Sequence, residues 1–174
     1  EPDAPENWCS LGNARLAAGA PAETEAAYAR AAELAPADAP VFFSRLADAF
    51  LRAGHPDRGQ AAMERCLALD PGEPLYLMEL GNMLLCRGNT DDAAAAYARA
   101  ASLRPASAGA IWYRLGTTLT AERHHRPATE AFANACAAEP GNSRYLLALA
   151  ASYASRGLTD LAAATLLQVE TPIP

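Results

Sequence analysis

The sequence predicts an all-α fold, and three observations support that prediction: an alanine-rich composition, a repeat of 34 to 35 residues, and a turn signal inside each repeat. Roughly a quarter of the 174 residues are alanine, whereas valine and isoleucine are scarce. Alanine favours helices because its side chain loses no conformational entropy there. Sequence typical of β-strands is almost absent.

The repeat is most visible in four prolines that end successive units. They are Pro36, Pro71, Pro105 and Pro140, at spacings of 35, 34 and 35 residues. Trp8 and Trp112 are 104 residues apart, the same distance as those three steps together. Within each unit the apolar residues recur with a helical period, so we expect two helices of about fourteen residues per unit.

A turn divides each unit in two. In four units a glycine suits the left-handed residue that ends a helix, and a proline or threonine follows it, as is typical of the first turn of a helix. The glycines are Gly19, Gly54, Gly88 and Gly157, followed by Pro21, Pro56, Thr90 and Thr159. The fourth unit has Glu122-Arg123-His124 instead, without a glycine.

These units resemble the tetratricopeptide repeat, whose pattern is W-x2-L-G-x2-Y, then A-x3-F-x2-A, then P. The first part is represented by Trp8-Leu11-Gly12, Phe43-Leu46-Ala47, Leu77-Leu80-Gly81, Trp112-Leu115-Gly116 and Leu146-Leu149-Ala150. The aromatic position of the second part holds Tyr28, Met63, Tyr97, Phe132 and Leu166. Small residues in the first and second helices of each unit are expected to let the two backbones approach closely.

The resemblance implies a right-handed α-solenoid of about five antiparallel helix hairpins. One array would cover 5–170, with repeats at about 5–38, 40–73, 74–107, 109–142 and 143–170 and tails at 1–4 and 171–174. The fifth repeat lacks an obvious polar cap, so we expect the natural chain to continue beyond residue 174 or to pair there with another chain.

The resemblance also implies a concave groove lined by the first helix of each repeat, which the family uses to hold peptides. Its candidate residues here are Asn13, Val41, Arg45, Asp48, Arg52, Leu75, Met78, Glu79, Asn82, Tyr113, Arg114, Thr117 and Arg144. An apolar middle is expected from Val41, Leu51, Leu75, Met78, Leu85 and Tyr113, and exposed apolar surface beside charge is a common sign of an interaction site.

Arginines on the same side of the groove indicate a protein or peptide partner with apolar and acidic residues. They are Arg45, Arg52, Arg114 and Arg144. The alternative is that they pair internally with Asp48 and Glu79. The carboxylate clamp of the chaperone-tail binders in this family is excluded, because only Asn13 matches its pattern.

Other function classes find little support. A net charge of −6 disfavours nucleic-acid binding, and no apolar run is long enough to insert into a membrane. We expect no catalytic residues, no cofactor and no metal site. His124 and His125 are adjacent, so on a helix they diverge by about 100° and cannot share an ion; a solvated turn is expected. Four widely spaced cysteines are expected to be free thiols, which favours a cytoplasmic location and leaves a periplasmic one open.

The leading hypothesis is therefore a non-catalytic adaptor that binds proteins or peptides. Two alternatives are a substrate-recruiting module of a larger enzyme, such as a transferase or hydroxylase, and a scaffold that self-associates through its C-terminal repeat.

Overall fold

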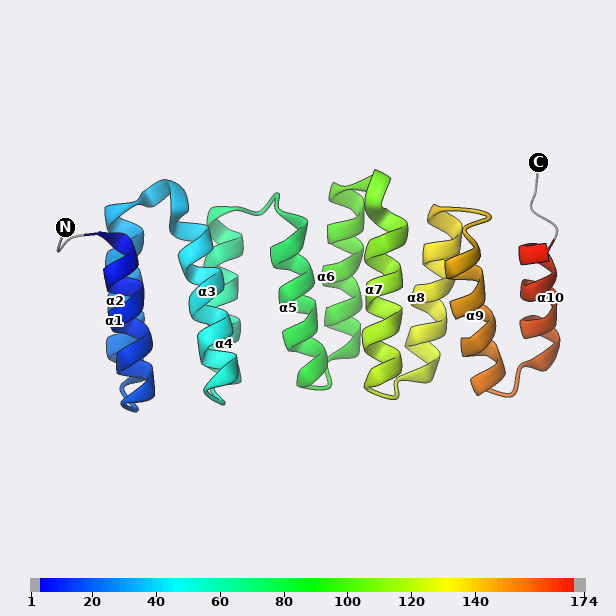
Figure 1. The fold of residues 1–174 in the computed structure, drawn as a ribbon, viewed down its shortest axis with the longest axis horizontal. Helices are drawn as coiled ribbons and strands as arrows, with labels where there is room; N and C mark the ends of the chain where they lie inside the picture. The colour runs from blue at the N-terminus through cyan, green and yellow to red at the C-terminus, as the bar shows by residue number, and fades with distance from the viewer. Residues whose placement is uncertain (1–3, 171–174) are drawn as a thin grey trace. The chain divides into compact units, whose positions relative to one another are not determined.

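A computed structural model describes residues 4–170, which form ten α-helices, two short 3₁₀ turns and no β-strand (Figure 1). The helices are α1 (Pro5–Ala17), α2 (Pro21–Leu34), α3 (Ala39–Arg52), α4 (Pro56–Leu69), α5 (Pro74–Cys86), α6 (Thr90–Leu103), α7 (Ala108–Ala121), α8 (His125–Ala138), α9 (Ser143–Ser155) and α10 (Thr159–Glu170). The 3₁₀ turns are Pro36–Asp38 and Pro105–Ser107. The predicted all-α class is confirmed. Of the predicted tails, only Ala4 lies within the described residues.

The chain divides into two compact units, residues 4–83 and 84–170, and the boundary falls inside α5. In the first unit α1 packs on α2 and α3 on α4, while α2 also contacts α3. In the second unit α7 packs on α8 and α9 on α10, with further contacts from α6 to α7 and from α8 to α9. Each unit therefore consists of helix pairs that pack on their neighbours. Within residues 4–170, no helix is both long enough and apolar enough to cross a bilayer.

The turn between the two helices of a pair has the left-handed backbone that the glycines predict. The φ angles are 77° at Gly19, 79° at Gly54, 79° at Gly88 and 74° at Gly157. In the turn that lacks glycine, Arg123 adopts the same conformation, with φ of 63°. Its backbone N–H donates to the Thr120 carbonyl at 3.1 Å, as the Gly54 N–H donates to Leu51 at 3.0 Å. The hydrogen bonds of the turn hold this geometry even where the residue disfavours it.

The second helices begin at the prolines and threonines that the sequence indicates, Pro21, Pro56, Thr90 and Thr159. Proline suits the first helical position because its missing N–H would have no partner in the helix there. In the fourth turn, His124 precedes α8 and His125 is its first residue, so the histidines lie at a helix start.

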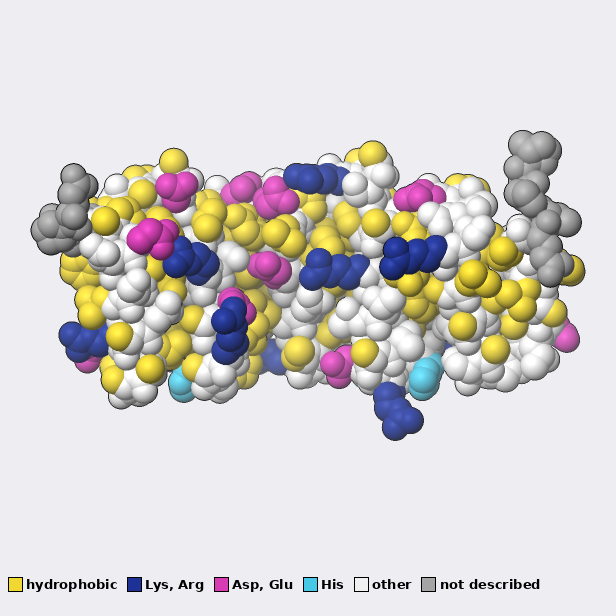
Figure 2. Space-filling model, in the orientation of Figure 1, with side chains coloured by type: hydrophobic (Ala, Val, Ile, Leu, Met, Phe, Trp, Pro, Cys, Tyr) yellow, Lys and Arg dark blue, Asp and Glu magenta, His cyan; other side chains and the backbone are white. Residues whose placement is uncertain are grey.

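Apolar side chains reach the surface of both units, next to arginines (Figure 2). The large exposed ones are Leu11, Val41, Leu69, Leu75, Leu103, Leu147, Leu161, Leu166 and Leu167. Isolated exposed leucines are ordinary in proteins, so their position relative to charged groups decides whether they matter.

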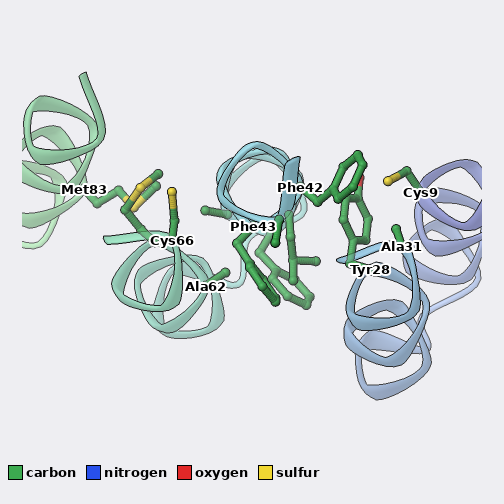
Figure 3. Close-up of a cluster of buried hydrophobic side chains, with 13 residues drawn as sticks. Cys9, Tyr28, Ala31, Phe42, Phe43, Ala62, Cys66 and Met83 are labelled. Atoms are coloured by element: carbon green, nitrogen blue, oxygen red, sulfur yellow. The ribbon is translucent and has the colours of Figure 1, made fainter. Parts of the chain in front are cut away.

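One buried cluster joins the helices of the first unit (Figure 3). Cys9 of α1 and Tyr28 of α2 lie at one end of it, Phe42 and Phe43 of α3 in the middle, and Cys66 of α4 with Met83 of α5 at the other end. The cluster is continuous from pair to pair because no single pair can cover its own apolar face.

Glycine allows the two helices of a pair to approach closely. A Cβ atom at Gly116 of α7 would lie 2.6 Å from ring carbons of Phe132 in α8, and one at Gly12 would lie 2.7 Å from Tyr28. In the pair α3/α4 the small residue is on the second helix, where a Cβ at Gly59 would lie 3.0 Å from the Ala47 carbonyl oxygen. The predicted close approach is confirmed in these three pairs.

The small residue in the first helix of a pair and the large residue in its second helix change together along the chain. Glycine in the first helix faces an aromatic ring, Tyr28 or Phe132, whereas Ala47 occupies the equivalent position in the pair whose second helix carries Met63. A flat ring needs the space that glycine leaves, and a flexible methionine can fit beside a methyl group.

We predict that Gly116→Ala destabilises the chain by about 1 kcal/mol. Alanine would gain about 1 kcal/mol of helix propensity, but overpacking against the buried Phe132 ring costs about 1–3 kcal/mol. Phe132→Leu should relieve the overlap, so the double variant should be more stable than the sum of the single effects by at least about 0.5 kcal/mol in urea unfolding. Gly72→Ala is the control, since its Cβ would meet nothing closer than 3.8 Å. Additive effects would contradict the steric account.

Candidate functional site

The candidate groove residues are all on first helices, and they fall in both units. Nine lie in residues 4–83, and Tyr113, Arg114, Thr117 and Arg144 lie in residues 84–170. A single groove that includes residues of both units stays a prediction.

In the first unit the structure brings four predicted residues around one hollow of about 230 Å³, on the side of α1 and α3. They are Asn13, Arg45, Asp48 and Arg52. Tyr28 completes the lining with Ala49, and its hydroxyl donates to Asn13 Oδ1 at 2.9 Å. We did not predict Tyr28 as a site residue, although its place in the repeat pattern, opposite Gly12, could have indicated it.

The two arginines of this hollow are already paired within the unit. Arg45 Nη1 donates to both carboxylate oxygens of Glu6, at 2.9 Å each, and this hydrogen bonding raises the pKa of Arg45. Arg52 pairs with Asp48, one turn earlier on α3, with Nε 3.1 Å from Oδ1. The internal pairing expected as the alternative is therefore present for Arg52, and for Arg45 with Glu6 as the partner.

Glu79 forms a hydrogen bond with a neighbouring first helix of the same unit. The Ser44 hydroxyl of α3 donates to Glu79 Oε2 of α5 at 3.0 Å, so this contact joins two neighbouring first helices. Asn82, one turn further along α5, is half-buried. Of the four candidate residues on α5, the two polar ones, Glu79 and Asn82, are thus at least partly engaged in the unit's own structure.

The apolar middle expected for the groove is only partly exposed. Val41 and Leu75 are 48% and 45% exposed, Leu51 is half-buried, and Met78 and Leu85 are only 9% and 3% exposed. The last two therefore differ from the expectation. Because α5 is apolar around most of its circumference, its sequence does not show which of its faces is covered.

In the second unit Tyr113 is the centre of an aromatic cluster. Its ring centroid lies 5.3 Å from that of Tyr145 in α9 and 5.7 Å from that of Phe132 in α8. The guanidinium carbon of Arg144 lies 4.5 Å from the Tyr113 ring centroid, a cation–π geometry. Tyr113 therefore positions the exposed Arg144 head group.

The candidate arginines of the second unit differ from those of the first because they have no carboxylate partner among the described residues. Arg114 and Arg144 are both exposed, and neither forms an ion pair with a carboxylate within residues 4–170. The prediction of arginines directed at an acidic partner therefore has its best support in this unit.

A second hollow, of about 290 Å³, lies beside these arginines between α7, α8 and α9. It is lined by Thr117, Thr120, His125, Phe132, Ala148, Ala151, Ser152 and Ser155. Of these only Thr117 is among the candidate residues. His125, expected in a solvated turn, is exposed and lies at the edge of the hollow. The small residues Ala148 and Ala151, one turn apart, are the sequence signal for this depression.

The four cysteines are free, as expected. Cys9 and Cys66 are buried and Cys136 is half-buried, and burial raises the pKa of all three thiols, that of Cys66 to about 12. Cys86 is exposed at the end of α5. The structure therefore leaves one readily accessible thiol among residues 4–170.

Comparison with known proteins agrees with the arrangement of the helices in pairs. Residues 44–111 match the sequence model of the tetratricopeptide repeat family. Residues 44–111 carry tetratricopeptide repeats. Among curated proteins the sequence has no match.

Solved structures with the same fold include three tetratricopeptide-repeat proteins of low sequence identity. MamA is 19% identical with a TM-score of 0.61, covering 95% of this chain and 89% of its own. PilF of Pseudomonas aeruginosa is 17% identical with a TM-score of 0.57, covering 98% and 77%. YrrB, described as a tetratricopeptide-repeat protein with an unusual peptide-binding site, is 17% identical with a TM-score of 0.56, covering 93% and 82%. These likenesses concern the fold.

We predict that one thiol of this tetratricopeptide-repeat chain reacts rapidly with Ellman's reagent at pH 8 and that Cys86→Ser abolishes the rapid phase. The thiolate is the reactive form, and burial keeps the others protonated. Burial raises the pKa of Cys66 from 9.0 in the unfolded chain to about 12 in the folded chain. The stabilisation that the protonated thiol contributes is therefore complete below pH 9 and is lost as the pH rises towards 12. Rapid reaction in Cys86→Ser would contradict the assignment.

Proposed function

We propose that this chain is a non-catalytic adaptor that binds a protein or peptide on the exposed faces of its first helices. One observation carries the proposal: in both units an exposed apolar residue lies one turn from an arginine. Val41 precedes Arg45 on α3, and Arg144 precedes Leu147, which is 50% exposed, on α9. Residues three or four positions apart share a face of a helix.

Physical chemistry supports this interpretation. Covering a half-exposed valine or leucine contributes about 1 kcal/mol, and a nearby arginine adds orientation through bidentate contacts to a carboxylate. Tetratricopeptide repeats stack into surfaces that bind other proteins. YrrB, described by its peptide-binding site, has the same fold. The partner segment proposed here carries apolar and acidic residues, and the net charge of −6 disfavours nucleic acid as a partner.

We expect the triple variant Val41→Glu, Leu75→Glu, Leu147→Glu to lose the natural partner in affinity capture from the source organism. These side chains are exposed, so the substitutions place charge on the proposed contact surface without cutting into the core. The matched control is Leu69→Glu with Leu103→Glu, which changes two exposed leucines on second helices.

The measurement is the recovery of each co-purified protein, with circular dichroism to verify that all variants are folded. Partners recovered equally by the wild type and the folded triple variant would contradict the proposal. Loss of the same partners from the control would show that binding does not use the first helices.

A second candidate function is self-association through the C-terminal helix pair. Its support is the cluster of exposed leucines on α10, namely Leu161, Leu166 and Leu167. If the chain uses this surface, sedimentation velocity should show a weight-average mass that rises with concentration. Leu161→Glu with Leu166→Glu should then restore the monomer. A concentration-independent monomer in the wild type would exclude this candidate.

A further inference from the structure

The hollow between α7, α8 and α9 is connected to the Arg144 guanidinium through aromatic contacts. Phe132 lines the hollow, and its ring centroid lies 5.7 Å from that of Tyr113. The guanidinium carbon of Arg144 lies 4.5 Å from the Tyr113 ring centroid. Arg114 lies on α7 one turn before Thr117, which also lines the hollow. An apolar depression and two exposed cations therefore occur together in one unit.

The hydroxyl groups around the hollow already have hydrogen-bond partners in the unit. Thr117 donates to the Arg114 carbonyl at 2.7 Å, Thr120 to the Gly116 carbonyl at 2.7 Å, and Ser155 to the Ser152 carbonyl at 2.8 Å. The Ser152 hydroxyl is 2.7 Å from that of the buried Thr129. An apolar side chain can therefore enter without leaving a buried donor unpaired, which would otherwise cost binding energy.

The size of the hollow suits an aliphatic side chain. Its volume of about 290 Å³ is roughly twice that of the 150 Å³ apolar cavity that accommodates benzene. The exposed Ala151 and the half-buried Ala148 form one wall, and the Phe132 ring forms another. These methyl groups and the phenyl ring favour an apolar guest, and the remaining lining consists of the Thr and Ser side chains described above and His125.

The charge on this surface is not balanced internally. In the first unit a carboxylate that binds Arg45 must displace Glu6, and one that binds Arg52 must displace Asp48. Arg114 and Arg144 have no such competitor within the described chain. Two separate cations on different helices match two acidic side chains better than the single carboxylate of a chain terminus.

We propose that this hollow and these two arginines form a two-point site for an extended acidic segment of a partner protein. An apolar side chain of the segment fills the hollow, and Asp or Glu side chains beside it pair with Arg144 and Arg114. The inference rests on the proposed function and places its main contact in the second unit.

The spacing of the segment follows from the helices. On α7 Arg114 precedes the first lining residue, Thr117, by three positions. On α9 Arg144 precedes Ala148 by four, and Figure 1 shows these two helices running in the same direction. One helical turn is about 5.4 Å, which an extended chain spans in about two residues. The acidic residues should therefore lie one or two positions from the apolar one.

The test is fluorescence polarisation with a labelled ten-residue probe of glycine and serine that carries one central leucine and a glutamate two residues to each side. Three matched probes replace the leucine with glycine, both glutamates with glutamine, or both glutamates with lysine. We expect the acidic leucine probe to bind at least about tenfold tighter than each of the others, and more weakly at high salt.

Variants locate the binding. Arg114→Gln with Arg144→Gln should weaken the probe at least about tenfold, since hydrogen bonds between charged groups are among the stronger polar contacts. Arg45→Gln with Arg52→Gln is the control, because these arginines are already paired. Ala151→Trp should fill the hollow and abolish binding, whereas Ala154→Trp, at an exposed residue of the same helix outside the hollow, should not. Thermal melts verify that each variant is folded.

The outcomes separate this inference from the proposed function. Equal binding of the acidic and glutamine probes, or unchanged binding in folded Ala151→Trp, would overturn the two-point site. No binding of any probe would also overturn it. The capture experiment with Val41, Leu75 and Leu147 variants would still test the adaptor function independently, because it depends on the natural partner and not on this probe.

Discussion

The contact between the two helices of each pair determines most of the structure. Where a tyrosine or phenylalanine ring lies against the backbone of the first helix, only glycine leaves enough space, as at Gly12 and Gly116. Within a pair, each helix buries one face against its partner. The next pair packs on a second face. The exposed part of the first helices carries the candidate arginines together with Val41, Leu75 and Leu147. The packing thus dictates where a binding surface can occur.

Much of the fold could be predicted because its signals are local and repeated. The prolines and threonines at helix starts, the glycines at turns and the helical period each constrain only a few neighbouring residues. The turn glycine and the helix-start signal recur in four of the five units. Even the irregular fourth turn keeps its backbone geometry, with Arg123 in the position of glycine. A repeated local signal marks where a helix begins, which is why the predicted starts of four second helices agree with the structure.

The site could be predicted only in part, because its properties depend on contacts between distant residues. Nothing local indicates that Arg45 pairs with Glu6, 39 positions earlier, or that Met78 of α5 is buried while Val41 of α3 is 48% exposed. The second hollow draws its lining from three helices, and its phenylalanine belongs to the repeat pattern as a packing residue. Identifying such a site requires side-chain positions on neighbouring pairs, whereas the repeat pattern specifies only which residues face the partner helix.

The internal ion pairs of Arg45 and Arg52 have a consequence for how a partner would arrive. A paired cation and anion form a dipole, whose field falls off faster with distance than that of an isolated guanidinium. Salt screens both fields beyond roughly 8 Å at physiological ionic strength. Among the four candidate arginines, long-range attraction would therefore originate mainly from Arg114 of α7 and Arg144 of α9, although the whole chain is negatively charged. Diffusional encounters of an acidic partner would be oriented towards those helices before any short-range contact forms, so added salt should slow association more than it speeds release.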